Sequence, residues 1–371
     1  MTRILMAVAA GVFLAPPLFA AVPDDIAALK KAPDRATWDR LANAGPDALL
    51  PILKAWPADD PVAANWLRTA FDRIAARHAD SLPADDLFAF ATDATGYGPA
   101  RRRAMAVVER VRPATAEKWL SAALNDPEFG PDAVDRAVAA AEKLPVADAL
   151  VALRATFTAC TDYDQAQALA KKLTTAGDKP DVWAHLGVVG RWHLVGPFPV
   201  SPEDGLTKSF PPETKVDLTA EYEGKAGKLK WQAAAAEEGK VDLSKAGVKA
   251  EDGAVVYAVA RVRVPSATKG ELRVAAVDNV TVWVNGAKVV ERSNDYRSLY
   301  RTDRYRSPID LPAGESTVLV KLTKTRPDAG QQEAAARGGR PGGLSTRWDF
   351  QARLLSTAGR GLTFTQTEEK K

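Results

Sequence analysis

The stretch from Asn294 to Tyr305 interleaves aromatic side chains with arginines and acids. Aromatic faces stack on sugar rings, and planar guanidinium and carboxylate groups form paired hydrogen bonds with hydroxyls. The combination predicts a carbohydrate-binding site, whose candidate residues are Trp283, Tyr296, Arg297, Tyr300, Arg304 and Tyr305. An alternative has the tyrosines stacking on the arginines to cover a sheet edge, with no ligand.

The sequence offers few residues for catalysis. It has three histidines and one cysteine, and it contains no G-x-S-x-G or H-E-x-x-H motif and no phosphate-binding loop. Asp252 and Asp278 would serve glycoside hydrolysis if they faced each other across a cleft, but a chain with 47 acidic residues offers many such pairs. We expect no catalytic residues and a protein that is not an enzyme.

Metal, cofactor and nucleic-acid partners are equally weakly indicated. Asp278 and Asn279 could supply oxygen ligands to Ca²⁺ at a sheet rim, but an Asp-Asn turn is the favoured interpretation. We therefore expect no cofactor and no metal site, with Ca²⁺ as the alternative. The net charge of +3 is too small to predict binding to nucleic acid. Cys160 has no partner for an internal disulfide, and we expect a buried thiol.

Trp283 belongs to the best-specified element, the stretch VTVWVNGAKVV at 280–290. Asn285-Gly286 between two runs of β-branched residues predicts a hairpin with a type I′ turn, because both central residues need positive φ. The predicted cross-strand pairs are Val284 with Ala287, Trp283 with Lys288 and Val282 with Val289.

Alternating apolar residues predict a β-sandwich over 188–357. Short strands with one apolar face each, separated by turn residues, are typical of two packed antiparallel sheets. The clearest inward sets are Val256, Ala258, Ala260, Val262 and Val264, then Val318, Val320 and Leu322, then Trp348, Phe350, Ala352 and Leu354. We expect a flexible loop at 324–346 and a disordered tail at 358–371.

The chain from 22 to 187 has the 3.6-residue apolar period of amphipathic helices. Prolines precede the helical patterns, where their missing N–H has no helical partner to lose. They are Pro46, Pro61, Pro83, Pro99, Pro113, Pro131 and Pro145. Pairs of such helices suit a HEAT-like repeat, and a compact helical bundle is the alternative. The fold class predicted is thus multidomain, α followed by all-β.

Residues 1–21 have the pattern of a signal peptide. Arg3 precedes an apolar region from Ile4 to Leu18, and Ala20 or Ala21 could end the cleavage site. We expect an exported protein, periplasmic or extracellular, that does not span the membrane once this segment is removed.

The apolar period changes from 3.6 to 2 near residue 187, where we place the domain boundary. Gly177 to Pro180 ends the last helix, and Trp192 and Leu194 alternate as in a strand. Aromatic residues crowd this junction and polar linker residues are few.

Several motifs resemble a group of exported bacterial proteins common in planctomycetes. They are WHLVGPFP at 192–199, FPPE at 210–213, VDL at 216–218, EYEGK at 221–225 and WVNG at 283–286, with SLPADDL at 81–87 and GPARRR at 98–103. The resemblance implies a helical or HEAT-like region followed by a galactose-binding-like sandwich with jelly-roll order. It implies no reaction.

The function expected from these patterns is non-catalytic binding. The sandwich would bind carbohydrate or another envelope component, and the helical half a protein partner. A purely structural envelope protein is the alternative, and a glycoside hydrolase is less favoured.

Overall fold

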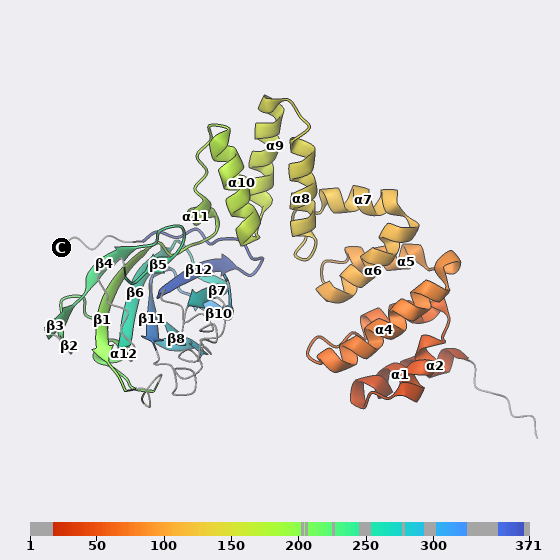
Figure 1. Cartoon of the computed structure of the whole chain (residues 1–371), viewed down its shortest axis with the longest axis horizontal. Helices are drawn as coiled ribbons and strands as arrows, with labels where there is room; N and C mark the ends of the chain where they lie inside the picture. The colour runs from red at the N-terminus through yellow and green to blue at the C-terminus, as the bar shows by residue number, and fades with distance from the viewer. Residues whose placement is uncertain are drawn as a thin grey trace, which may run out of the picture. The chain divides into compact units, whose positions relative to one another are not determined.

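The computed structural model describes residues 18–201, 204, 207–224, 227–244, 254–276, 279–292, 302–324 and 348–366. The chain divides into two compact units, 1–136 and 137–371. Helices come first and antiparallel sheets follow, so the predicted order of α then β structure is confirmed (Figure 1). The predicted boundary near 187 coincides with the change from helix to strand, whereas the compact units divide within a helix. The last helices therefore belong to the same unit as the sheets.

Several helices of the first unit begin at or next to a proline, or after a capping residue. α4, for example, starts at Pro61, and the carboxylate of Asp60 accepts the backbone N–H groups of Val62 and Ala63 at 3.0 Å. The helices up to the division are α1 (Leu18–Lys31), α2 (Arg35–Ala42), η1 (Pro46–Ala48), α3 (Leu49–Lys54), α4 (Pro61–Arg77), η2 (Ala79–Ser81), α5 (Ala84–Thr92), α6 (Gly98–Val111) and α7 (Pro113–Ala122), with α8 (Gly130–Ala141) spanning it.

A buried arginine joins three segments of the first unit. Arg101 is 1% exposed and donates to the Asp126 carboxylate at 2.6 Å and to the Ala91 carbonyl at 2.9 Å. The two arginines that follow are also paired, Arg102 with Glu128 and Asp132, and Arg103 with Asp72. These ion pairs neutralise the arginine run at the start of α6.

The second unit contains the remaining helices and all the strands. The helices are α9 (Val146–Ala159), α10 (Tyr163–Thr175), α11 (Val182–His185) and α12 (Pro211–Thr214). The strands are β1 (Arg191–Pro199), β2 (Glu221–Gly224), β3 (Gly227–Lys230), β4 (Gln232–Ala235), β5 (Val241–Asp242), β6 (Ala254–Val264), β7 (Thr268–Ala276), β8 (Asn279–Val284), β9 (Ala287–Arg292), β10 (Tyr305–Leu311), β11 (Gly314–Lys324) and β12 (Asp349–Ser356).

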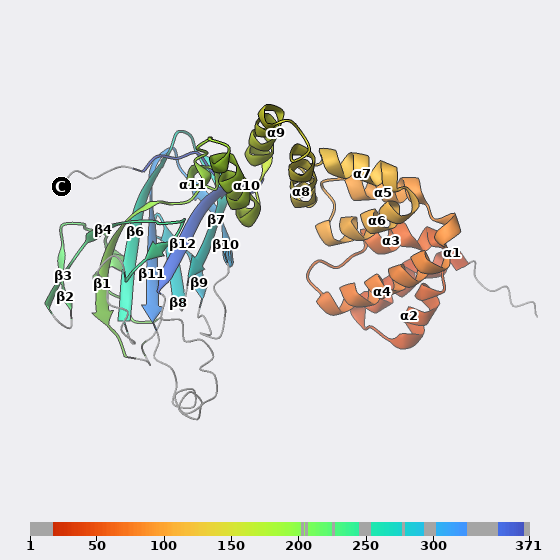
Figure 2. The same ribbon diagram turned by 45° about the horizontal axis from the view of Figure 1, so that its top comes forward.

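Two antiparallel sheets face each other in this unit, as Figure 2 shows. One has six strands in the order β4-β1-β6-β11-β8-β9, and the other has four in the order β10-β7-β12-β5. A hairpin of β2 and β3 forms a separate small sheet. Each inward set of residues that the alternation predicts, from β6, β11 and β12, lies in one core between the sheets.

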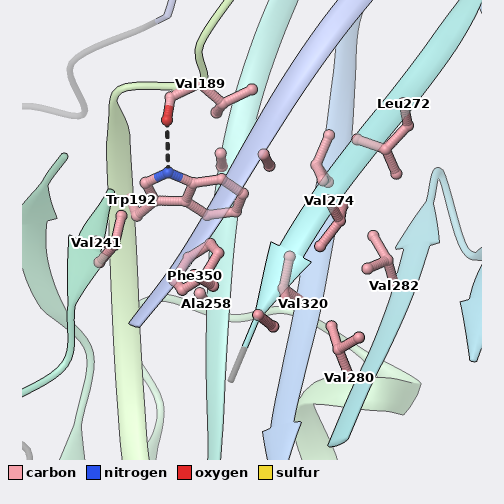
Figure 3. Packing of buried hydrophobic residues seen from close by; sticks show 14 of the residues in the cluster. Val189, Trp192, Val241, Ala258, Leu272, Val274, Val280, Val282, Val320 and Phe350 are labelled. Atoms are coloured by element: carbon pink, nitrogen blue, oxygen red, sulfur yellow. Dashed lines mark hydrogen bonds between the residues drawn. The ribbon is translucent and has the colours of Figure 1, made fainter. Parts of the chain in front are cut away.

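Trp192, on β1, packs in the middle of that core (Figure 3). It is 2% exposed, its ring meets that of Phe350 edge-on with centroids 4.9 Å apart, and its indole N–H donates to the Val189 carbonyl at 2.8 Å. A buried indole requires such a partner, because an unpaired N–H costs free energy in an apolar interior.

The hairpin prediction is correct at the turn and wrong further along the strands. Asn285 and Gly286 have φ of 50° and 81°, as a type I′ turn requires. Beyond Trp283 a bulge shifts the register, so that Val282 pairs with Val290 and not with Val289. The extra residue brings Val290 into the core.

The tail prediction is wrong for residues 358–366. The backbones of Thr365 and Arg263 exchange hydrogen bonds of 2.8 and 3.0 Å. The Gln366 carboxamide accepts the N–H groups of Gly190 and Arg191 and donates to the Arg191 carbonyl. The side-chain amide of Gln366 thus forms hydrogen bonds to the backbone of the kind that a neighbouring strand would form. Residues 367–371, like most of the predicted loop at 324–346, lie outside the described residues.

Two further expectations concern single features. Cys160 is buried, at 2% exposed, as predicted. Within the part of the chain that the structure describes, no helix combines the length and the apolar character needed to cross a bilayer.

We predict that Gly187→Ala destabilises the second unit much more than Gly177→Ala. Both glycines have positive φ, +67° and +88°, but a Cβ at Gly187 would overlap the Leu354 carbonyl and lie 2.9 Å from Gly361 Cα, whereas a Cβ at Gly177 meets nothing within 4 Å. Gly177→Ala should cost roughly 1 kcal/mol from backbone strain, and Gly187→Ala a further ~1–3 kcal/mol from overpacking. Urea unfolding measures both, and equal losses would contradict the close packing.

Candidate functional site

Of the six predicted binding residues, one lies on a covered sheet face, two lie at or just before the start of β10, and three lie outside the described residues. Trp283 is partly buried in an apolar cluster on the outer face of the six-stranded sheet, together with Phe198 and Leu319. Arg304 stacks on Tyr305, with its guanidinium carbon 5.3 Å from the ring centroid. This stacking is the contact that the alternative without ligand predicts. Tyr296, Arg297 and Tyr300 lie outside the described residues.

A buried ion pair holds the segment that covers this outer face. The Lys321 ammonium donates to the Glu213 carboxylate at 2.8 Å and to the Lys208 carbonyl at 2.6 Å. The Tyr257 hydroxyl donates to the same carboxylate, and burial, reinforced by that carboxylate, raises the pKa of Tyr257 far above its usual range. The ion pair therefore secures α12 against the sheet and keeps the aromatic cluster covered.

A polar cleft of about 420 Å³ lies elsewhere in the second unit, between α10 and the end strand β5 of the four-stranded sheet. Side chains from the N-terminal part of α10, the turn before β5, β5 itself, the approach to β10 and the start of β12 line it. They are Tyr163, Asp164, Gln167, Glu237, Glu238, Lys240, Asp242, Thr302 and Asp349.

Tyr163 ties the helical wall of the cleft to the sheet. α10 begins at Asp162, whose carboxylate accepts the N–H groups of Asp164 and Gln165 at 3.0 and 2.9 Å. This cap places Tyr163 at the first helical position, where its hydroxyl accepts a 2.7 Å hydrogen bond from the Gln351 side chain. Burial raises the pKa of Tyr163, so the phenol stays neutral over a wider pH range.

The opposite wall is a tight turn at 237–240. Glu237 and Lys240 exchange backbone hydrogen bonds of 2.8 and 3.0 Å, and the two residues between them have φ of 48° and 75°. These are the features of a type I′ turn. The Gly239 carbonyl accepts from Gln351 at 2.9 Å, and a Cβ at Gly239 would lie 2.7 Å from the Trp183 ring. The turn is therefore held against both the helices and the sheet.

Two aspartates face each other at the edge of the sheet. Asp242 on β5 pairs with Asp349 on β12, and directly opposed residues of antiparallel strands have Cβ atoms about 4.5–5.5 Å apart. Asp349 is 3% exposed. The Asp242 carboxylate accepts from the backbone and the hydroxyl of Ser244 at 3.0 and 2.5 Å.

A buried charge cluster fixes Thr302 in the cleft wall through its neighbour Asp303. The Asp303 carboxylate accepts from Arg353 at 2.8 Å and from Arg273 at 3.1 Å. Arg353 also donates to the Leu186 carbonyl at 2.9 Å and lies over the Tyr163 ring, 5.2 Å from its centroid. Burial lowers the pKa of Arg353, which is the cost of placing this cation beneath the helices.

The cleft has the chemistry of hydrogen bonding to a polar ligand. Its lining combines five carboxylates with one ammonium, one amide, one aliphatic hydroxyl and one phenol. No group of three or more His, Cys, Asp and Glu side chains arranged to hold a metal occurs within the described ranges. Of the proposed Ca²⁺ ligands, Asn279 is buried at the start of β8 and Asp278 lies outside those ranges.

Sequence reasoning missed this cleft because its walls are far apart in the chain. Tyr163 in the lining and Gln351, its hydrogen-bond partner on β12, are 188 residues apart. The one local signal was Glu237-Glu-Gly-Lys240, an X-Gly pair between polar residues that is typical of a tight turn. It indicates a turn and says nothing about a ligand.

Comparisons with known proteins assign no family. No family model matches the chain, and no curated protein matches it. Solved structures with weak similarity to it include the following three. An anti-sigma factor domain-containing protein from Clostridium clariflavum has a TM-score of 0.23 and 11% identity over 50% of this chain. A β-glucosidase from Kluyveromyces marxianus in complex with glucose has 0.23 and 11% over 44%. A GH31 α-xylosidase from Xanthomonas citri has 0.20 and 10% over 46%.

This chain spans 49%, 15% and 16% of those three proteins, respectively. Similarity at these TM-scores identifies neither the fold nor the function of this chain.

We predict that Tyr163→Phe lowers the stability of the second unit by about 1–2 kcal/mol at neutral pH, because the Gln351 amide loses an acceptor. It should also flatten the loss of stability above about pH 10, where tyrosine normally ionises. The pKa of Tyr163 is raised in the folded state, so its contribution is complete below the unfolded pKa and is lost as pH rises toward the folded one.

Urea unfolding at pH 8 and pH 10.5 tests this, with Tyr305→Phe as the control for removing a partly exposed phenol of the same unit. A Tyr163→Phe protein whose alkaline loss equals that of the wild type would contradict the assigned role.

Proposed function

We propose that this chain is a non-catalytic exported protein that binds carbohydrate, or another hydroxyl-rich envelope component, in the cleft between α10 and β5. The observation that carries the proposal is the cleft of about 420 Å³ lined by polar side chains of both signs. Its volume is within the ~300–1,000 Å³ of small-molecule sites. The site differs from the one that Trp283 and its neighbours suggested, because Trp283 is partly covered.

Sugar hydroxyls match the lining. Each hydroxyl both donates and accepts, so carboxylates such as Asp242 accept from it, while Lys240 and Gln167 donate to it. Tyr163 is also part of the lining, and its hydroxyl is held by Gln351. Hydrogen bonding of this kind requires walls that do not move, which the turn and the cap of α10 provide.

We predict that Gln167→Ala and Asp242→Asn each weaken glycan binding roughly tenfold, as the loss of one hydrogen bond to a charged or amide group does. Isothermal titration with cello-, xylo-, manno- and chito-hexaose measures the effect. The matched controls are Gln232→Ala on the exposed edge of β4 and Asp310→Asn at the far end of β10, both of which should bind as the wild type does. A wild-type protein that binds none of these hexaoses would refute the proposal.

A glycoside hydrolase is the second candidate, because Asp242 and Asp349 are opposed on neighbouring strands and both line the cleft. Two carboxylates about 5–5.5 Å apart are the arrangement of a retaining glycosidase, one acting as nucleophile and the other as acid. The pair lies in the cleft, unlike Asp252 and Asp278, which are outside the described residues.

The non-catalytic proposal predicts no release of reducing ends when the same hexaoses are incubated with the protein for a day. A hydrolase predicts release that Asp349→Asn abolishes, while Asp310→Asn leaves it intact. Release with that dependence would replace the binding proposal.

The finer architecture is also part of the proposal. We take the helices as HEAT-like repeats that engage a protein partner, and the sheets as a galactose-binding-like jelly roll. Three large apolar side chains near the start of α9 support a protein partner, since Leu144, Val146 and Val151 are 45%, 83% and 65% exposed. A purely structural envelope protein is the alternative, and it predicts that substitutions in the cleft leave all binding unchanged.

A further inference from the structure

The cleft contains a residue in a backbone conformation that its side chain does not favour. Glu238 has φ of +48°. Within the described ranges, the other non-glycine residues with positive φ are Asn285 and Asp303. Asparagine and aspartate tolerate this region because their short side chains bond locally to the backbone, and glutamate is too long to do so.

The chain itself provides the comparison. Asn285-Gly286 and Glu238-Gly239 are both the central pair of a type I′ turn. At the first turn asparagine is stabilised, since its side chain accepts the N–H of Thr317 at 2.9 Å and donates to Ser316. Glu238 is exposed and has no hydrogen bond or ion pair with any residue that the structure describes. Its side chain therefore contributes nothing visible to the stability of its turn.

Glycine at position 239 is required by packing, whereas glutamate at 238 is not. A Cβ at Gly239 would lie 2.7 Å from Trp183 and 2.9 Å from the Tyr163 hydroxyl. That contact orients the turn and directs the neighbouring residue to the cleft, where Glu238 forms part of the lining. Strained backbone at a ligand-facing position is characteristic of binding sites, where the strain is retained for the contact that the side chain makes.

We propose that Glu238 is a specificity-determining residue of the cleft, whose carboxylate accepts hydrogen bonds from two neighbouring hydroxyls of the bound ligand. The inference rests on the function proposed above and names the ligand feature that the site selects, a vicinal diol. A carboxylate presents two acceptor oxygens and no donor, which matches two adjacent O–H donors.

The test separates stability from binding in the full chain. Glu238→Asn places in this turn the residue that the other turn uses, and it should raise the Tm by about 1–3 °C, the shift expected when a strained residue is relieved in a unit of this size. It should also weaken binding of the tightest hexaose roughly tenfold. Glu238→Gln keeps the length and the strain but loses one acceptor, so it should weaken binding with the Tm unchanged. Asp310→Asn is the control for losing an exposed carboxylate elsewhere in the unit.

The outcomes are distinguishable. Stabilisation by Glu238→Asn, combined with weaker binding by both variants, supports the inference. Unchanged affinity of either Glu238 variant, when Gln167→Ala and Asp242→Asn weaken binding, overturns the role of Glu238 and leaves the proposed function standing. A Tm that does not rise in Glu238→Asn refutes the claim that Glu238 strains the backbone of its turn. A wild type that binds none of the hexaoses removes the proposed function and this inference with it.

Discussion

The strand β12 is buried on both faces, and the arrangement of the second unit depends on how its polar face is satisfied. Phe350, Ala352 and Leu354 enter the core between the sheets. Gln351 and Arg353 point the other way and are 2% and 1% exposed. Burying an amide and a guanidinium costs several kcal/mol unless they are hydrogen bonded. Their partners include Tyr163 on α10 and the carbonyl of Leu186, the residue that follows α11.

This requirement also accounts for the cleft. Because Gln351 reaches both Tyr163 and Gly239, the start of α10 and the turn before β5 are held at a fixed separation. Polar side chains of the helix and the turn then line the space between them. The same contacts that satisfy the buried strand thus create a rigid, hydrophilic concavity, and rigidity is what limits the entropic cost of binding a ligand there.

The two sheet faces that point outward are covered by different chemistry. Over the six-stranded sheet the cover is largely aromatic, with Phe210 against Phe198 and Tyr257, and one ion pair beneath α12 secures it. Over the four-stranded sheet, the buried polar side chains of Gln351 and Arg353 are hydrogen bonded to Tyr163 and to the Leu186 carbonyl. An apolar cover excludes both water and ligand. Polar side chains in a cover can instead exchange their hydrogen bonds for hydrogen bonds to a bound solute. This contrast favours the cleft, rather than the surface around Trp283, as the proposed binding site.

The sequence by itself determined what depends on neighbouring residues. Alternation placed the inner faces of β6, β11 and β12 correctly, Asn285-Gly286 specified its turn, and prolines such as Pro61 and Pro113 marked helix starts. Only the tertiary structure decided the bulge that pairs Val282 with Val290, the attachment of the tail through Gln366, and the meeting of Tyr163 with Gln351. The first group follows from local backbone preferences and side-chain period. The second depends on which distant segment satisfies a buried polar group, and no local pattern records that choice.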